Sequence, residues 1–411
     1  MERGDFEYFE RIQDLDQGAI QRIMKKTIVI PIYLKPDRRE ALSTAEGLRL
    51  AKRAIESLKI LEDQDFTLIL PVCIDLVGEV SEDAFSEMDQ FVREEVKAIR
   101  PERTLIFSSR HLKYLKDYLF QKNFENFSLL IDLKGFSKIR NVGLLLAQSL
   151  AMDAAIFIDN DEMVEDPNYL KIACEYLGGR WDGKEIVGKG GFYLNPDGSI
   201  LVPSQELWWR FFWNKTKWMN RVWGEILSSK DRLVPSPMLL GGNLVLHHYL
   251  FRSIPFDPYI PRGEDTDYLI NANQWGFSIL FDKQLRVKHI HPKRTEVYFL
   301  EELRGDIERF LYEREKVKGG LPINLDPYPG YFLKWTLYPK ALLTSLLLSL
   351  DHLRKGEWEK GWKCIDNIQL LLRGGEGGWL KYLKFRADWE SVMGEIQKEG
   401  LNSILERCWV Q

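Results

Sequence analysis

The chain has few cysteines and no excess of basic charge. Its 411 residues include 4 cysteines, and these lie far apart, at Cys73, Cys174, Cys364 and Cys408. Because no CxxC spacing occurs, we expect neither a zinc site nor a disulfide framework, and a reduced cytoplasmic setting fits best. The formal net charge of −4 argues against a nucleic-acid partner held by bulk positive charge.

Long apolar runs are also missing. The acidic stretch 1–16 lacks the basic and apolar regions of a signal peptide, and no run reaches the about 20 apolar residues of a transmembrane helix. The run 341–350 is apolar but too short to span a bilayer. Its default interpretation is a core helix, and the alternatives are a face that docks on the inner side of the membrane or forms a homodimer.

Strand-like and helix-like segments, by contrast, alternate along the chain. Strand-favouring runs occur at 27–33, 66–75 and 104–107, and helix-like sequence occupies 39–61 and 82–99. This alternation predicts an α/β fold with a mainly parallel sheet and helices on both faces. We expect four regions, namely a helical N-terminal extension (1–25), an α/β half (26–165), a second half of that domain (166–295) and a helical C-terminal region (296–411).

The second half shows turn and strand patterns of its own. Residues 188–200 read as a hairpin around an Asn-Pro-Asp-Gly turn, and 238–247 as a Gly-Gly loop that enters a strand. Residues 261–267 (PRGEDTD) open a predicted helix that runs to about Trp275. Closing strands are then expected at 277–281 and 285–291.

An apolar strand ends in two aspartates at Asp159 and Asp161. Side chains two residues apart point the same way along an extended chain, so this spacing predicts that the two carboxylates converge. Ligands of open α/β sheets bind outside the carboxyl ends of the strands. Two carboxylates there suit Mg²⁺ or Mn²⁺. The alternative is a polar strand exit in which Asp161 caps the next turn.

A basic loop precedes that strand. Residues 134–143 (KGFSKIRNVG) form a Gly/Ser/basic loop that contains Lys138 and Arg140 and leads into an apolar helix ending near Leu150. Free N–H groups and positive charge at a helix start attract an anion. The sequence therefore predicts that a phosphate and a metal ion share one site.

The order of these motifs resembles that of the GT-A-fold glycosyltransferases, closest to family 2 of the nucleotide-sugar-dependent transferases. The motifs are SKIRNVG before a helix, FIDND, GGN and RGEDTD, and the resemblance covers residues 26–295. It implies a Rossmann-like mixed sheet with a nucleotide-sugar-binding half (26–165) and an acceptor-binding half (166–295). It also implies a metal-dependent hexosyltransferase that uses a nucleotide diphosphate sugar. The hydroxyl acceptor would be a sugar, a glycerate-like small molecule or a lipid-linked sugar.

On the donor side, the resemblance assigns Asp159 and Asp161 to the metal that bridges the donor diphosphate. His291 is the implied further metal ligand, and His289 is the second choice. The alternative interpretation is a histidine on a strand edge whose hydrogen bonds are made by the backbone. The implied donor contacts are Pro31, Tyr33, Asp75, Lys138, Arg140, Asp159 and Asn160. The first strand departs from the family pattern, because Pro-Ile-Tyr-Leu-Lys stands where Pro-Thr-Tyr-Asn is common.

On the acceptor side, the resemblance makes Asp265 the general base of an inverting reaction and Glu264 an acceptor-binding carboxylate. Asp267 is near enough in sequence to substitute, and retaining enzymes of similar outline need no such base. Alternatively, the acids simply favour a helix start through the helix dipole. The implied acceptor-binding residues are Gly241, Gly242, Asn243, Trp209 and Arg262.

Five tryptophans lie between residues 206 and 223, and most are expected to be packed in the core, with one or two reaching a substrate. Two other functions compete with the transferase. A sugar-phosphate nucleotidyltransferase would carry a Gly-rich signature after the first strand, and 31–38 contains no glycine. A non-catalytic carbohydrate-binding protein on a degenerate fold would not need both aspartates, the late histidines and Glu264-Asp265 together.

Overall fold

The computed structural model describes residues 24–34, 46–75, 82–100, 102–181, 184–203, 211–290, 296–375 and 377–410. Three predictions lie outside the described residues. They are the helical extension over 1–23, the acceptor contact of Trp209 and the metal contact of His291.

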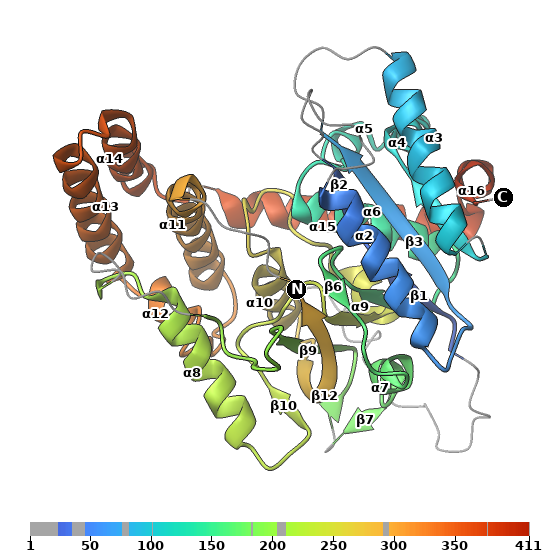
Figure 1. The fold of residues 1–411 in the computed structure, drawn as a ribbon, viewed down its shortest axis with the longest axis horizontal. Coiled ribbons are helices and arrows are strands. Elements are labelled where there is room, and N and C mark those ends of the chain that lie inside the picture. The colour runs from blue at the N-terminus through green and yellow to red at the C-terminus, as the bar shows by residue number, and fades with distance from the viewer. Residues whose placement is uncertain are drawn as a thin grey trace, which may run out of the picture.

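A mixed sheet of 10 strands runs through the molecule (Figure 1). Its order is β10-β12-β9-β11-β5-β1-β3-β2, with β4 beside β3 and β6 beside β12. Strands β7 (Arg180–Trp181) and β8 (Lys184–Glu185) form a separate pair. The strands of the large sheet are β1 (Lys26–Val29), β2 (Ile32–Leu34), β3 (Thr67–Ile74), β4 (Thr104–Phe107), β5 (Ala154–Phe157), β6 (Glu162–Met163), β9 (Gly188–Leu194), β10 (Leu233–Pro235), β11 (Leu244–His247) and β12 (Ile279–His289).

The strands of the first half are parallel. Strand β1 pairs with β3 and β5, and β3 pairs with β2 and β4, all in parallel. Strand β11 is antiparallel to both β5 and β9, and it joins the two halves of the sheet. The carboxyl end of β5 therefore lies where the parallel half meets the second half. This arrangement confirms the predicted mixed α/β fold.

Helices cover both faces of the sheet, because the apolar side chains of β1 point alternately to one face and the other. Ile28 and Ile30 share a core with α2 (Glu46–Ser57), α3 (Glu82–Ile99) and α7 (Tyr169–Cys174). Val29 points to the opposite face, where the core has a second set of helices. These are α4 (Ser109–Gln121), α5 (Glu125–Ser128), α6 (Phe136–Ser149), α9 (His248–Ser253), α10 (Glu264–Gln274), α15 (Gly378–Glu399) and α16 (Asn402–Cys408). The short 3-10 helix η2 (Leu58–Ile60) follows α2.

The C-terminal helices pack against the sheet domain. Trp389 of α15 is fully buried, and its Nε1 donates a hydrogen bond to the carbonyl oxygen of Phe251 at 2.9 Å. Trp409 forms a β-bridge with Leu105, and the N–H of Val410 donates to the carbonyl oxygen of Thr104 at 2.9 Å. A third core joins the sheet to helices α8 (Lys215–Ser228), α11 (Glu296–Gly319), α12 (Gly330–Leu333), α13 (Leu337–Arg354) and α14 (Trp358–Arg373).

Some predicted elements differ from the structure. The expected strand 27–33 is divided at Pro31, because a proline has no N–H to continue the ladder. Residues 195–198 form the expected turn, with Gly198 at φ 79°, but 199–200 form no second strand. The two closing strands are one strand, β12, with an irregularity between Phe281 and Arg286. Helices α4 and α5 were not predicted.

None of the helices in the described part of the chain is long and apolar enough to cross a membrane.

Candidate active site

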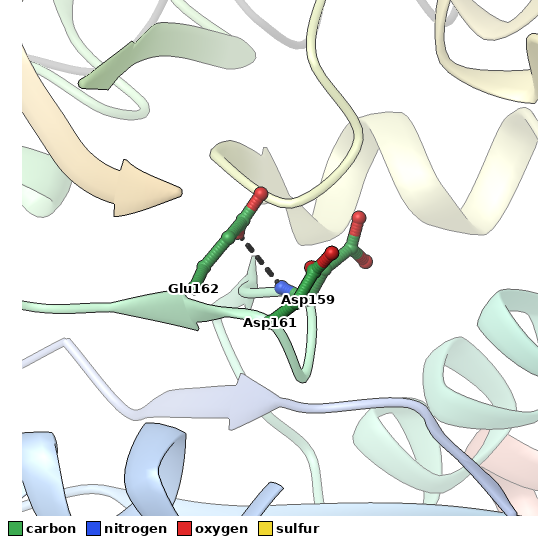
Figure 2. Close-up of side chains that lie close together, drawn as sticks. All are labelled: Asp159, Asp161 and Glu162. Atoms are coloured by element: carbon green, nitrogen blue, oxygen red, sulfur yellow. Dashed lines mark hydrogen bonds between the residues drawn. The ribbon is translucent and has the colours of Figure 1, made fainter. Parts of the chain in front are cut away.

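Asp159 and Asp161 lie on a tight turn after β5. The N–H of Glu162 donates to the carbonyl oxygen of Asp159 at 3.1 Å, so the chain turns where we had expected it to stay extended. The carboxylates converge nevertheless. One carboxylate oxygen from each of Asp159, Asp161 and Glu162 lies within 4.8 Å of the others (Figure 2). The turn brings together three carboxylates, where the sequence predicted two.

Glu162 is the third member of this group, and sequence reasoning gave it no role. Its side chain is 1% exposed, and one oxygen accepts the N–H of Asp159 at 2.9 Å. The other oxygen, Oε1, has no hydrogen-bond partner among the described residues. Burial raises the pKa of Glu162 well above its usual value, and repulsion from Asp159 and Asp161 raises it further. A buried carboxylate of this kind favours a cation as its neighbour.

His289 is the histidine that the structure places at this turn. Its Nε2 lies 3.2 Å from Oδ2 of Asp161, and the end of β12 pairs in register with β6, His289 opposite Glu162. The sequence prediction preferred His291, which lies outside the described residues, and named His289 second. Within the described chain, His289 is therefore the histidine in reach of the carboxylates.

Arg140 connects the turn to the start of α10. Its Nη2 lies 2.5 Å from Oδ1 of Asp159, and its Nη1 lies 3.0 Å from Oε1 of Glu264. The guanidinium is 2% exposed. Burial lowers the pKa of Arg140, but attraction to Asp159 and Glu264 outweighs burial and raises it above its ordinary value. We expected Arg140 to pair with a phosphate, whereas here it bridges two carboxylates.

Four side chains at the turn suit a hard divalent cation. The three carboxylates offer oxygen atoms, His289 offers an imidazole nitrogen, and Oε1 of Glu162 is buried without a partner within the described chain. Mg²⁺ and Mn²⁺ prefer such oxygen-rich sites, which leave positions for phosphate oxygens and water. The residues present therefore fit a metal of this class.

The carboxylates predicted for the acceptor side are next to this turn. Glu264 is buried and pairs with Arg140. Asp265 is half-buried, and its Oδ2 accepts the N–H of Gly241 at 3.2 Å while its Oδ1 accepts the N–H of Thr266 at 2.6 Å. Burial raises the pKa of Glu264 to about 6, since attraction to Arg140 opposes that effect only in part and repulsion from Asp265 adds to it. The two acids thus differ in burial, because Glu264 is buried and Asp265 is half-buried.

The Gly-Gly loop fits closely between these groups. A Cβ atom on Gly242 would lie 2.2 Å from Oε2 of Glu162, and one on Gly241 would lie 2.7 Å from Nη2 of Arg140. Only glycine fits at such separations. The N–H of Gly242 donates to the hydroxyl of Tyr193 at 2.7 Å. The loop therefore lies against both Glu162 of the carboxylate turn and the bridging Arg140.

Asn243 is placed differently from the prediction that it contacts an acceptor. It is fully buried, and its Nδ2 donates to the carbonyl oxygens of Phe192 at 3.0 Å and Leu285 at 3.2 Å. Its Oδ1 accepts the hydroxyl of Tyr169 at 2.9 Å. Because its polar atoms are used in the core, Asn243 holds the loop in place and does not reach a ligand.

Arg262 and Asp267 also face inward. Arg262 donates to the carbonyl oxygen of Glu302 at 3.2 Å and so ties the start of α10 to α11. Asp267 is fully buried and pairs with Lys316 at 2.7 Å. Burial and the ion pair with Lys316 therefore disfavour Asp267 as a replacement for Asp265.

The predicted donor contacts surround the start of α6. The ring of Tyr33 lies 5.3 Å from that of the exposed Phe136, and the Tyr33 hydroxyl is buried with no hydrogen-bond partner in the described chain. Asp75 pairs with Lys134 at 2.9 Å. Lys138 and Asn160 are half-buried, and Pro31 is buried behind Tyr33. These side chains lie on the parallel half of the sheet, beside the carboxylate turn.

The tryptophans of the aromatic segment are mostly packed where the structure describes them. Trp213 and Trp223 are buried in the third core, and Trp218 stacks on Tyr331 with ring centroids 4.0 Å apart. This agrees with the expectation that most of them belong to the core. The other two, at 208 and 209, lie outside the described residues.

Comparison with known proteins gives no sequence relative. No family model matches the chain, and no curated protein is significantly similar to it. Among solved structures, one similar to it is a mannosyltransferase from Pyrobaculum calidifontis in complex with GDP-Man and Mn²⁺. It is 10% identical, with 96% of this chain and 94% of that chain covered and a TM-score of 0.44.

Two further structures show comparable similarity. GalNAc-T7 with UDP, GalNAc and Mn²⁺ is 13% identical, with 77% of this chain and 56% of that chain covered and a TM-score of 0.40. The glucosyl-3-phosphoglycerate synthase from Mycobacterium tuberculosis with Mn²⁺, uridine diphosphate and glucosyl-3-phosphoglycerate is 15% identical. There, 70% of this chain and 78% of that chain are covered, with a TM-score of 0.37. Similarity at this level assigns no activity, so any assignment has to come from the chemistry of the site.

Proposed function

We propose that the protein is a metal-dependent glycosyltransferase that moves a hexosyl group from a nucleotide diphosphate sugar to a hydroxyl acceptor, with inversion at the anomeric carbon. One observation carries the proposal. The buried guanidinium of Arg140 contacts both Asp159 of the carboxylate turn and Glu264 beside Asp265. A candidate cation site and a candidate base therefore lie on either side of the Arg140 side chain. A displacement reaction needs the donor and the acceptor to be held next to each other in this way.

On the donor side, Asp159, Asp161, Glu162 and His289 would hold the metal. When bound, the metal supplies Lewis-acid stabilisation to the departing nucleoside diphosphate. Lys138 on the first turn of α6 adds positive charge, and Tyr33 and Phe136 offer aromatic faces to a nucleoside or a sugar. These contacts would orient the donor with its diphosphate toward the carboxylate turn.

On the acceptor side, Asp265 would remove the proton of the acceptor hydroxyl. The N–H groups of Gly241 and Thr266 each donate to one of its oxygens. A carboxylate has about four lone-pair sites, so both oxygens can still accept a proton. Glu264 is enclosed and fixed by Arg140, which suits a hydrogen bond to the acceptor better than proton transfer.

The proposal is tested by thermal-shift measurements with a panel of nucleotide diphosphate sugars, each with and without Mn²⁺. A donor that binds only the folded state raises the melting temperature, and the shift should need the metal. Product analysis with the stabilising donor and a panel of hydroxyl acceptors then reports transfer.

Two results would contradict the proposal. The first is stabilisation by a nucleoside triphosphate with a sugar phosphate, accompanied by release of pyrophosphate, which identifies a nucleotidyltransferase. The second is stabilisation by free sugars alone, without metal or nucleotide, which identifies a carbohydrate-binding protein.

A further inference from the structure

Helix α13 lies at the outer edge of the molecule, on the side away from the parallel strands (Figure 1). The sequence prediction made the apolar run 341–350 a core helix by default, but four of its six leucines are exposed. Leu350 is 62% exposed, and the nearby Trp335 is 72% exposed. The leucines Leu342, Leu343 and Leu346 are 37%, 40% and 39% exposed.

The buried face of α13 is made largely of small side chains. Ala341, Thr344, Ser345 and Ser349 face inward, and the hydroxyl of Thr344 donates to the carbonyl oxygen of Lys340 at 2.7 Å. Small residues let the neighbouring helix α14 come close, as the fit of Gly361 beside Ser349 shows. The helix thus buries small and hydroxyl-bearing residues and exposes four of its leucines, whereas an ordinary surface helix buries its apolar side chains.

The exposed face carries no polar side chain between Leu342 and Leu350. Tryptophans stand near both ends of this face. Trp335 precedes α13, and Trp358 and Trp362 at the start of α14 are 64% and 60% exposed. Over residues 334–363 there are six lysines and arginines and three aspartates and glutamates, a local charge of +3, whereas the whole chain carries −4.

We propose that this surface, formed by α13 and the start of α14, docks onto the surface of an anionic phospholipid bilayer. A helix with an unbroken apolar face lies in the plane of the interface, with that face at the boundary between headgroups and acyl chains. Tryptophan and the long basic side chains favour the same boundary. The local positive charge is attracted to anionic headgroups although the protein as a whole is negative.

A second copy of the chain is the other candidate occupant, and the composition favours the bilayer. Protein interfaces as a whole are only about as apolar as the remaining surface, and they form hydrogen bonds across a polar rim. The four exposed leucines of this face offer no hydrogen bond. The proposal does not depend on the proposed function, because docking needs neither a donor nor a metal.

The test is co-sedimentation of the full chain with vesicles of phosphatidylcholine and phosphatidylglycerol in equal amounts, compared with vesicles of phosphatidylcholine alone. We expect binding to the anionic vesicles that weakens as salt is added. The double substitution Leu346→Gln with Leu350→Gln should reduce the fraction bound by about tenfold, because two apolar groups no longer enter the interface. The matched control is Leu129→Gln with Leu227→Gln, two leucines that are 73% and 50% exposed elsewhere on the surface.

Thermal unfolding of each variant shows whether it is folded, and exposed leucines should leave the melting temperature nearly unchanged. Three results would overturn the proposal. They are absence of binding to anionic vesicles, equal loss of binding in the control variant, and a dimer in sedimentation velocity that the Leu346 and Leu350 substitutions dissociate. A blue shift of tryptophan fluorescence on anionic vesicles, reduced in Trp335→Phe, would support it independently.

Discussion

Two buried charge clusters in this protein differ in how completely they are paired. In the first, Arg140 bridges Asp159 and Glu264 at the candidate active site. In the second, the fully buried Asp282 lies between Lys189 at 3.1 Å and Arg232, whose Nε is 2.9 Å away. Lys189 also donates to the carbonyl oxygens of residues 172 and 175, at 2.5 and 2.9 Å. The second cluster therefore has a partner for every ammonium proton.

The first cluster is surrounded by polar atoms that have no partner among the described residues. They are Oε1 of Glu162, Nε of Arg140 and the hydroxyl of Tyr33. The pKa values diverge accordingly. Burial raises the pKa of Asp282, but its two cations outweigh burial and lower it, whereas burial and repulsion from Asp161 leave the pKa of Asp159 raised. A buried cluster in which every polar atom has a partner stabilises the fold. A buried cluster with unpaired polar atoms has hydrogen-bonding capacity left for a ligand.

The largest expected difference between the two clusters is the loss of activity when a carboxylate of the first cluster's turn is replaced. Replacing Asp161 by Asn removes a proposed metal ligand whose partner within the fold is His289 at 3.2 Å, so metal-dependent transfer should fall by more than about a thousandfold. The free energy of unfolding without metal should be unchanged or higher, because repulsion among the carboxylates decreases. Turnover and urea unfolding measure the two effects. Glu165→Gln, an exposed carboxylate beyond the turn, is the control, and metal-dependent turnover at the wild-type rate in Asp161→Asn would refute the site.

The opposite result is expected at the saturated cluster. Asp282→Asn leaves Lys189 buried without its counterion and should reduce the free energy of unfolding by about 3–5 kcal/mol. The folded fraction should keep its turnover number. Urea unfolding measures the loss, and Asp351→Asn, which removes a half-buried partner of the exposed Lys355, should cost less than about 1 kcal/mol. A cost as small as that control would show that the two clusters do not differ.

A smaller effect on rate is expected at Asp265. Asp265→Asn keeps the shape and removes the proposed base, so turnover should fall by at least about 100-fold while donor binding persists. Asp267→Asn is the matched control and should act on stability, because Asp267 pairs with the buried Lys316. The anomeric proton of the product reports the stereochemistry by NMR. Retained configuration would exclude Asp265 as the base of an inverting reaction.

The smallest effect concerns pH. The pKa of Asp282 is lower in the folded protein than in the unfolded chain, so its contribution to stability is complete above the usual carboxylate range. That contribution is lost as the pH falls through the folded value. The stabilities of wild type and Asp282→Asn should therefore converge below about pH 4. Urea unfolding at a series of pH values tests this, and a constant difference would show that Asp282 is not ionised in the fold.

Part of the site was predictable from the sequence because it follows strand order. Asp159 and Arg140 lie on either side of one buried strand, and parallel strands present such residues at a common edge. The role of Glu162 depends on the pairing of β6 with β12, which places His289 opposite Glu162. No local sequence pattern reveals this pairing. Asn243 could not be assigned for a similar reason, since its partners are Phe192, Leu285 and Tyr169.

The orientation of α13 was not predictable either. Hydrophobic periodicity identifies which face of a helix is buried only when the other face is polar. The run 341–350 interleaves leucines with serine, threonine and alanine, and the small residues read as breaks in a core pattern. Close packing against α14 selects them for the inside, and this is a tertiary effect.

The β-bridge between Trp409 and Leu105 affects how easily the sheet edge of one molecule can pair with another molecule. Strand β4 is paired on one side with β3, and the bridge together with the bond from Val410 to Thr104 occupies part of its other side. An uncovered edge strand offers its N–H and C=O groups to the edge of another chain. Residues 409–410 therefore cover part of an edge at which a strand of another chain could otherwise pair.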